Sequence, residues 1–305
     1  MIIQHLKNVK VSKILKFSVK DIRFPTSKDL TGSDAIHTDP DYSATYVTVY
    51  TDNENLKGFG IAFTIGKGND IVAECIKHFF PIFENMQLDD LENNIGKLWF
   101  KCVDHSQLRW LGPEKGVVHM AVAAIFNCLW DLIAKKNKKP LWKFVVESEP
   151  ETILSWLTFK YIEDVLTPDE ALKLLQKMQN SKQERIDTIL NEGYPSYTTA
   201  AGWLGYSDEK TIQLCKEYMA KGWKHFKIKV GLDLDADVKR LELIRKTIGD
   251  DCFIMVDANQ QWSVKQSIKH INAYKKFNLF FVEEPTSPDD VMGFVKIKKE
   301  VGDVR

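Results

Sequence analysis

Three charged motifs recur along the chain at nearly equal intervals, and each one follows a run of strand-forming residues. The first contains Lys227 and Lys229 (KIK), the second begins with Asp257 (DAN) and the third begins with Glu283 (EEP). Lys229 precedes Asp257 by 28 residues, and Asp257 precedes Glu283 by 26 residues. Such an interval holds one strand, one helix and their loops, so the motifs are expected side by side at the carboxyl ends of adjacent parallel strands.

These side chains together predict proton abstraction beside a metal ion. Lys227 and Lys229 lie two apart on a strand and therefore share a face. Two neighbouring ammonium groups disfavour each other's charge, which allows a lysine to act as a general base near neutral pH. Asp257 and Glu283 offer hard carboxylate oxygens, which suit Mg²⁺ better than zinc. A base beside Mg²⁺ can remove a proton next to a carboxylate, because the ion stabilises the resulting enediolate.

The elements that must position these groups form a repeating pattern after residue 190. Strands are predicted at residues 197–201, 225–230, 252–258 and 279–283, and helices at residues 208–221, 235–247, 264–277 and 289–301. Four successive βα units fit either a parallel α/β barrel or a doubly wound sheet. A closed barrel of this type needs eight such units.

The first half of the chain has a different pattern. Residues 46–51 and 59–64 predict a hairpin, since turn-forming residues separate two β-rich runs. The glycines in and after the second run lack the order of a phosphate-binding loop. Apolar residues recur at helical spacing from Val117 onward, and a polar stretch at residues 147–151 indicates a domain boundary. We therefore predict two domains, residues 1–150 and 151–305.

Composition narrows the classes of partner and compartment. The chain has 42 basic and 42 acidic residues, so its charge gives no reason to expect nucleic acid or an anionic membrane as a partner. No uninterrupted run of about 18 apolar residues occurs, which argues against a membrane span. The five cysteines form no CxxC pair, which fits a reducing intracellular compartment and no zinc site.

The first 20 residues are basic and carry no acidic side chain. Their lysines are Lys7, Lys10, Lys13, Lys16 and Lys20. This stretch is either a mitochondrial targeting segment, although it lacks the expected arginine, or a first β-strand that includes Val9, Val11, Phe17, Val19 and Ile22. The expected location is therefore mitochondrial or cytoplasmic.

The charged motifs, read with their neighbours, resemble a known superfamily. The strings HFKIKVG, MVDANQQW and FVEEPTSPDD resemble the mandelate-racemase-like branch of the enolase superfamily. Longer strings resemble the L-fuconate dehydratases within that branch: GSDAIHTDPDYSA (32–44), QLRWLGPEKGVVH (107–119), GYPSYTTAAGWLGYSDE (193–209) and FVEEPTSPDD (281–290). The resemblance runs from about residue 18 to residue 300.

The resemblance implies an α/β protein in which an N-terminal α+β capping domain, residues 1–150, precedes an incomplete (β/α)8 (TIM-type) barrel. It implies that Lys229 moves the proton, that Asp257 and Glu283 bind Mg²⁺ and that Lys227 contacts the substrate. It also implies that a loop of the capping domain reaches the substrate through Gly32, Ser33, Asp34 and Tyr42.

The implied reaction is dehydration of a sugar acid, which would be the small-molecule partner, by a protein that could also form a homo-oligomer. The family places its third Mg²⁺ ligand on the fifth barrel strand and a His–Asp acid/base pair on the sixth and seventh, beyond these 305 residues. His225 and His270 are not placed to substitute. The expectation is therefore a fragment of a longer enzyme, with a non-catalytic short form that acts by binding, or another acid-sugar dehydratase or an epimerase of the branch, as alternatives.

Overall fold

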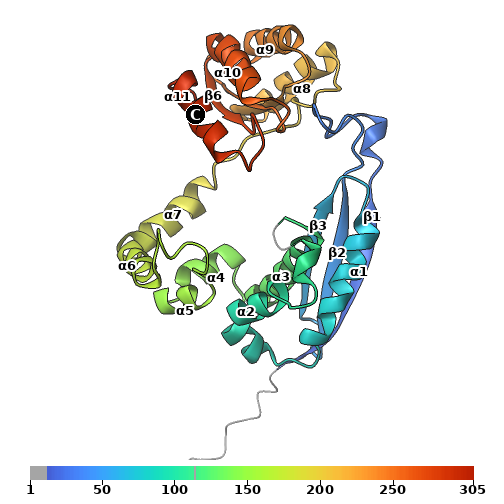
Figure 1. Cartoon of the computed structure of the whole chain (residues 1–305), viewed down its shortest axis with the longest axis vertical. Coiled ribbons are helices and arrows are strands. Elements are labelled where there is room, and N and C mark those ends of the chain that lie inside the picture. The colour runs from blue at the N-terminus through green and yellow to red at the C-terminus, as the bar shows by residue number, and fades with distance from the viewer. Residues whose placement is uncertain (1–11, 113–114) are drawn as a thin grey trace, which may run out of the picture. The chain divides into compact units, whose positions relative to one another are not determined.

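The computed structural model describes residues 12–112 and 115–305, which form two compact units (Figure 1). One unit combines the chain up to Arg23 with Ser43–Gly193, and the other combines Phe24–Tyr42 with Tyr194–Arg305. Val9 and Val11 of the predicted first strand, and the basic residues before them, lie outside the described residues.

The first unit is built on an antiparallel sheet with the strand order β1-β2-β3. Its strands are β1 (Ile14–Arg23), β2 (Ser43–Thr51) and β3 (Lys57–Thr64). The predicted hairpin is confirmed, with Val47 opposite Gly60 and Val49 opposite Gly58. Strand β1 covers the described part of the predicted N-terminal strand and pairs with β2 along its length.

Helix α3 (Val117–Lys136) is the core helix of this unit and packs against the inner face of the sheet. A side chain at Gly58 or Gly60 would collide with the carbonyl oxygens of Cys128 and Ala124, so these glycines allow helix and sheet to approach closely. By length and mean hydropathy (1.8), α3 would pass as a membrane span, but 61% of its apolar window is buried inside the protein. Such burial is typical of a core helix.

The remaining helices of the first unit complete its core. They are α1 (Asn69–Phe79), α2 (Leu88–Val103), α4 (Leu141–Glu147), α5 (Pro150–Ser155), α6 (Pro168–Met178) and α7 (Lys182–Glu192). The unit extends past the boundary predicted near residue 150. Trp156 joins it through ring contacts with Trp130 at 4.9 Å and Phe144 at 6.0 Å between centroids. The compact units therefore divide after Gly193.

The second unit contains a parallel sheet with the strand order β4-β5-β6. Its strands are β4 (His225–Lys229), β5 (Phe253–Asp257) and β6 (Leu279–Glu283), and its helices are α8 (Asp208–Ala220), α9 (Leu234–Ile248), α10 (Val264–Tyr274) and α11 (Val291–Val301). Alternate strand residues such as Phe226, Ile228, Ile254 and Val256 enter a fully buried core with these helices. The other strand residues therefore face away from the helices.

The first strand predicted for this sheet, residues 197–201, is not a regular strand. Thr198 forms only an isolated parallel bridge with Phe226. A turn then closes from Gly202 N to Thr199 O at 2.9 Å, and the chain returns to β4 where Lys229 N donates to Gly202 O at 2.9 Å. The turn inserts residues between the two points of pairing, which interrupts the strand and projects a loop at the carboxyl end of β4.

Candidate active site

The three charged motifs meet at the carboxyl ends of the parallel strands. Lys229 lies opposite Asp257 in the β4–β5 ladder, and Asp257 lies opposite Glu283 in the β5–β6 ladder. Lys227 shares the face of Lys229, and both lysines are 8% exposed. Because the apolar strand residues face the helices, the charged residues line the opposite face of the sheet.

Lys227 lies between the two carboxylates. Its Nζ is 2.8 Å from Glu283 Oε2 and 3.3 Å from Asp257 Oδ2, and it lies 4.8 Å from the centre of the Tyr197 ring. Burial lowers the pKa of Lys227, but hydrogen bonds to Glu283 and Tyr197 and the two carboxylate charges outweigh burial and raise the pKa above its usual range. Around Lys227, attraction by the carboxylates therefore outweighs the effect of burial.

Lys229 has a different set of neighbours. Its Nζ donates to Asp257 Oδ2 at 2.7 Å and to Asn259 Oδ1 at 2.7 Å, and it lies 5.8 Å from the centre of the Trp203 ring. Asn259 adopts a left-handed backbone conformation (φ 48°), and its N–H donates to Asp257 Oδ1 at 3.0 Å. Asp257 thus accepts one hydrogen bond from Lys229 through Oδ2 and another from the backbone of Asn259 through Oδ1.

Asp257 and Glu283 are two residues of the charged cluster that could hold a cation. Both carboxylates reach the same positively charged atom, Lys227 Nζ, so their oxygens converge on one point. Hard oxygens that converge in this way fit Mg²⁺. Glu284 follows the end of β6 in a left-handed conformation (φ 46°). Within the described ranges, no group of three or more His, Cys, Asp or Glu side chains could hold a metal ion.

The loop predicted to reach the substrate belongs to the same compact unit as these strands. Ser33 fastens it to the loop after Thr198: Leu204 N donates to Ser33 O at 3.1 Å, and Gly205 N donates to Ser33 Oγ at 2.9 Å. Ser33 Oγ in turn donates to Leu30 O at 2.7 Å. Ser33 is 2% exposed, so its hydroxyl holds the loop in place.

Asp34 is likewise engaged within the loop. Its Oδ1 accepts from Ile36 N at 2.8 Å and from His37 N at 2.7 Å, and its Oδ2 is 3.0 Å from His37 Nδ1. Asp34 is 5% exposed. The carboxylate therefore stabilises a tight turn and orients the partly exposed imidazole of His37.

Tyr42 is the member of the predicted set whose surroundings link the loop to the charged cluster. Its hydroxyl donates to Gly32 O at 3.3 Å, and its ring occupies the space that a side chain at Gly32 would need. Burial raises the pKa of Tyr42, the charge of Asp34 adds to this rise, Lys227 opposes it and Asp257 again adds to it. The Tyr42 hydroxyl is thus close enough to interact electrostatically with Lys227 of β4 and with Asp257 of β5.

The predicted site omitted three residues that contact the lysines and a fourth that supports one of these three. Tyr197 and Trp203 provide ring contacts, Asn259 provides an amide oxygen, and Arg240 holds the backbone of Trp203. Asn259 follows Asp257 by two residues, which was a usable signal. The other three depend on the loop conformation and on helix packing, which residue spacing does not specify.

The two histidines of this unit's barrel segment lie away from the charged cluster. His225 begins β4 and stacks on Phe253, with 4.6 Å between ring centroids. His270 lies in α10, where it contacts Trp262 at 4.6 Å between ring centroids and Tyr274. Neither is placed to exchange a proton beside Lys229.

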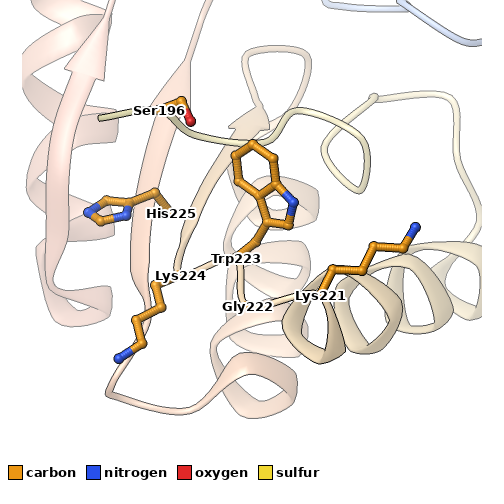
Figure 2. A pocket seen from close by; sticks show the side chains of 6 residues that line it. All are labelled: Ser196, Lys221, Gly222, Trp223, Lys224 and His225. Atoms are coloured by element: carbon orange, nitrogen blue, oxygen red, sulfur yellow. The ribbon is translucent and has the colours of Figure 1, made fainter. Parts of the chain in front are cut away.

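A surface pocket lies at the opposite, amino-terminal end of β4 (Figure 2). It is lined by Ser196, Lys221, Gly222, Trp223, Lys224 and His225. The side chains of Lys221 and Lys224 extend in opposite directions from Trp223 (Figure 2). Because the two cations diverge, the pocket does not form a convergent charged site.

Comparison with known proteins connects this geometry to one family. A family model described as Enolase C-terminal domain-like matches residues 210–304. The L-galactonate dehydratase of Hypocrea jecorina is 45% identical over 288 residues, which cover 93% of this chain and 64% of that protein. The crystal structure of human mitochondrial enolase superfamily member 1 aligns with a TM-score of 0.92 and 46% identity, covering 95% of this chain and 66% of that one.

A more distant structure, a racemase from Streptomyces coelicolor A3(2) with bound magnesium, aligns with a TM-score of 0.69 and 24% identity over 95% of this chain and 67% of its own. The chain thus spans just under two thirds of the length of its 45–46% identical relatives. The family match, the sequence identity and the structural agreement show that the chain belongs to the enolase superfamily.

Proposed function

We propose that this chain is part of a Mg²⁺-dependent acid-sugar dehydratase, a carbon–oxygen hydro-lyase that converts L-fuconate into 2-dehydro-3-deoxy-L-fuconate. The observation that carries the proposal is the contact of Lys229 Nζ with Asp257 Oδ2 at 2.7 Å, beside Glu283 on the next strand. A proton acceptor next to paired carboxylates is what abstraction of an α-proton from a carboxylic acid requires.

Asp257 and Glu283 would hold the Mg²⁺ ion. Their oxygens already converge on one cationic atom, and carboxylates are the ligands that this ion prefers. When bound, the ion would supply positive charge that stabilises the extra negative charge on the substrate carboxylate. The choice of ion rests on this donor chemistry.

The two lysines would have separate roles. Lys227 Nζ lies on the charged face, 2.8 Å from Glu283 Oε2 and 3.3 Å from Asp257 Oδ2, where a positive charge would attract the substrate carboxylate and oppose its negative charge. Among the described residues, Lys229 Nζ bonds to one carboxylate, that of Asp257, and to the neutral amide of Asn259. We therefore assign proton transfer to Lys229 and substrate contact to Lys227.

The reaction begins with transfer of the α-proton to the Lys229 amine. The electron pair of the broken C–H bond passes into the substrate carboxylate to give an enediolate, which can take back a proton. When the enediolate collapses, this electron pair forms a double bond to the β-carbon as the β-hydroxyl group departs. A general acid protonates this hydroxyl to give water, and the resulting enol becomes the 2-keto acid. The resemblance to the family places that acid outside these 305 residues.

The relative named L-galactonate dehydratase supports the reaction class and narrows the substrate. L-Galactonate and L-fuconate have the same configuration and differ at the terminal carbon, which carries a hydroxyl group in the first and only hydrogens in the second. Protein groups near the terminal carbon of the substrate would therefore distinguish the two acids. We propose that the loop that carries Ser33, Asp34 and Tyr42 lies over this carbon.

A panel of sugar acids tests the proposal in the full-length protein, meaning these residues within a chain as long as its relatives. With Mg²⁺ present, L-fuconate and L-galactonate should yield 2-keto acids, with L-fuconate preferred by kcat/KM. Preference for L-galactonate would correct the substrate, whereas no 2-keto acid from any member of the panel would reject the dehydratase.

We also infer an intracellular location, mitochondrial or cytoplasmic. All five cysteines are buried and free, which suits a reducing compartment, and one relative is named a mitochondrial protein. Fractionation of cells that express the full-length protein, with and without residues 1–11, distinguishes the two compartments. Import into mitochondria that depends on residues 1–11 would favour the mitochondrial location.

A further inference from the structure

Trp203 is a neighbour of the proton-transfer candidate that the sequence did not reveal. Lys229 Nζ lies 5.8 Å from the centre of its ring, within the range at which an aromatic face attracts a cation. The same ammonium group donates to Asp257 and Asn259, each at 2.7 Å. The indole is therefore the apolar member of the set that surrounds Lys229.

The backbone of Trp203 is held from two sides. From α9, the guanidinium of the half-buried Arg240 donates to Trp203 O at 2.6 Å and to Tyr206 O at 3.4 Å. From the loop Phe24–Tyr42, Ser33 accepts the hydrogen bond of Gly205 N at 2.9 Å. The turn that carries the indole is thus fixed to a helix and to a second loop.

The ring itself has an additional contact. Tyr42 meets Trp203 edge to face, with 6.1 Å between centroids and 87° between the ring planes. Edge-to-face packing of this kind favours one orientation of the pair. Trp203 is half-buried, so part of its ring remains open to solvent and to a bound molecule.

We propose that Trp203 is a positioning residue for Lys229, and that Arg240 anchors it. A lysine side chain has four rotatable bonds. Hydrogen bonds to the oxygens of Asp257 and Asn259 restrict its ammonium group but leave the methylene chain some conformational freedom. The fixed indole face removes part of this freedom and holds Nζ at the carboxyl end of β4, where the α-carbon would lie. The inference rests on the proposed function, because it assigns Trp203 to the same proton transfer.

The first test measures the accessibility of Lys229 without using activity. Reductive methylation of the full-length protein, followed by mass spectrometry, reports how fast each lysine reacts. Trp203→Leu should speed methylation of Lys229 by about tenfold, since it removes a desolvated cation–π contact. The matched control is Tyr197→Leu, which removes the ring beside Lys227 and should speed methylation of Lys227 instead.

The second test measures transfer of the α-proton from a sugar acid in deuterated water. Trp203→Leu should slow exchange by about 10–100-fold through kcat, because small displacements of a reacting group have large effects on rate. Affinity for Mg²⁺, measured by calorimetry, should be unchanged. Trp203→Phe keeps an aromatic face and should recover most of the rate, and Arg240→Lys should show a weaker loss than Trp203→Leu.

The results of these tests distinguish failure of the role proposed for Trp203 from failure of the proposed dehydratase function. Wild-type methylation and exchange in Trp203→Leu would overturn the positioning role, as would equal losses in the Leu and Phe variants. If Lys229→Met retained exchange, the base assignment would fail, yet the methylation test would still decide whether Trp203 holds Lys229. If Trp203→Leu does not fold, Trp203→Phe and Arg240→Lys carry the comparison.

Discussion

At the scale of single residues, the positive and negative charges of the charged cluster balance one another. Two ammonium groups face two carboxylates, with Asp257 shared between Lys227 and Lys229. Asp257 is 2% exposed, so removal of its charge would leave two buried lysines with fewer partners. Loss of one partner of a buried ion pair typically costs about 3–5 kcal/mol, so variants in this cluster need a test of folding beside any test of function.

The first prediction concerns the metal ligands. Asp257→Asn and Glu283→Gln should each weaken Mg²⁺ binding to the full-length protein by about tenfold or more, since the loss of even an outer-sphere partner can cost that much. Glu284→Gln is the matched control, because Glu284 lies beyond the strand end and outside the converging pair. Calorimetric titration gives the affinities and circular dichroism the folding. A larger loss in the Glu284 variant than in the Glu283 variant would contradict the assignment.

At the scale of the elements, a buried hydrogen-bond network supports the loop that follows β4. Asp237 in α9 accepts from Gly231 N at 2.9 Å and from Tyr274 Oη, in α10, at 2.8 Å. Asp237 is 2% exposed and links two helices to the first residues after the lysine strand. Burial raises the pKa of Asp237, although both hydrogen bonds act to lower it.

The second prediction follows from this network. Asp237→Ala should lower the free energy of unfolding by about 1–3 kcal/mol for each buried donor left without a partner. Since the pKa is raised in the folded state, the unfolded chain loses this proton first, near pH 3.8. The stability of the wild type relative to Asp237→Asn should therefore be highest below that pH and decline above it until the folded pKa is passed. Denaturant unfolding from pH 3 to pH 8 measures the difference, and a relative gain with rising pH would contradict the sign.

The strands and the loop before β4 show which features could be predicted from the sequence and which could not. The spacing of Lys229, Asp257 and Glu283 was sufficient to place them on adjacent strands, because parallel ladders pair residues one βα unit apart. The turn between Thr198 and Gly202 was not predictable, since it depends on hydrogen bonds from the backbone of β4 to Thr198 and Gly202. The raised pKa of Lys227 also needed coordinates, because it depends on which of several opposing charges lies nearest.

At the scale of the whole molecule, the parallel sheet leaves part of its apolar surface uncovered. Phe253 is 43% exposed and Phe280 is 36% exposed. On the side away from β5, Val282 N of β6 donates to Arg305 O at 2.8 Å, so the edge is paired there by a short segment. An exposed apolar surface of this kind is a site at which chains can associate.

The third prediction concerns the 305-residue chain expressed alone. It should be largely insoluble or oligomeric, bind Mg²⁺ more weakly than the full-length protein and fail to dehydrate L-fuconate, since the resemblance to the family places the third metal ligand and the acid outside these 305 residues. Size-exclusion chromatography, calorimetry and assay of 2-keto acid measure these properties. A soluble monomer with cooperative unfolding and dehydratase activity would show that the chemistry lies elsewhere in the chain.

The most direct test of the account is isotope exchange at the α-carbon of L-fuconate by the full-length Lys229→Met variant. Methionine is close to lysine in length but cannot accept a proton, so exchange with deuterated water should fall to the uncatalysed rate. Affinity for Mg²⁺ should persist, because Asp257 and Glu283 remain. Exchange at the wild-type rate in a folded, Mg²⁺-binding Lys229→Met protein would contradict the assignment of Lys229 as the base.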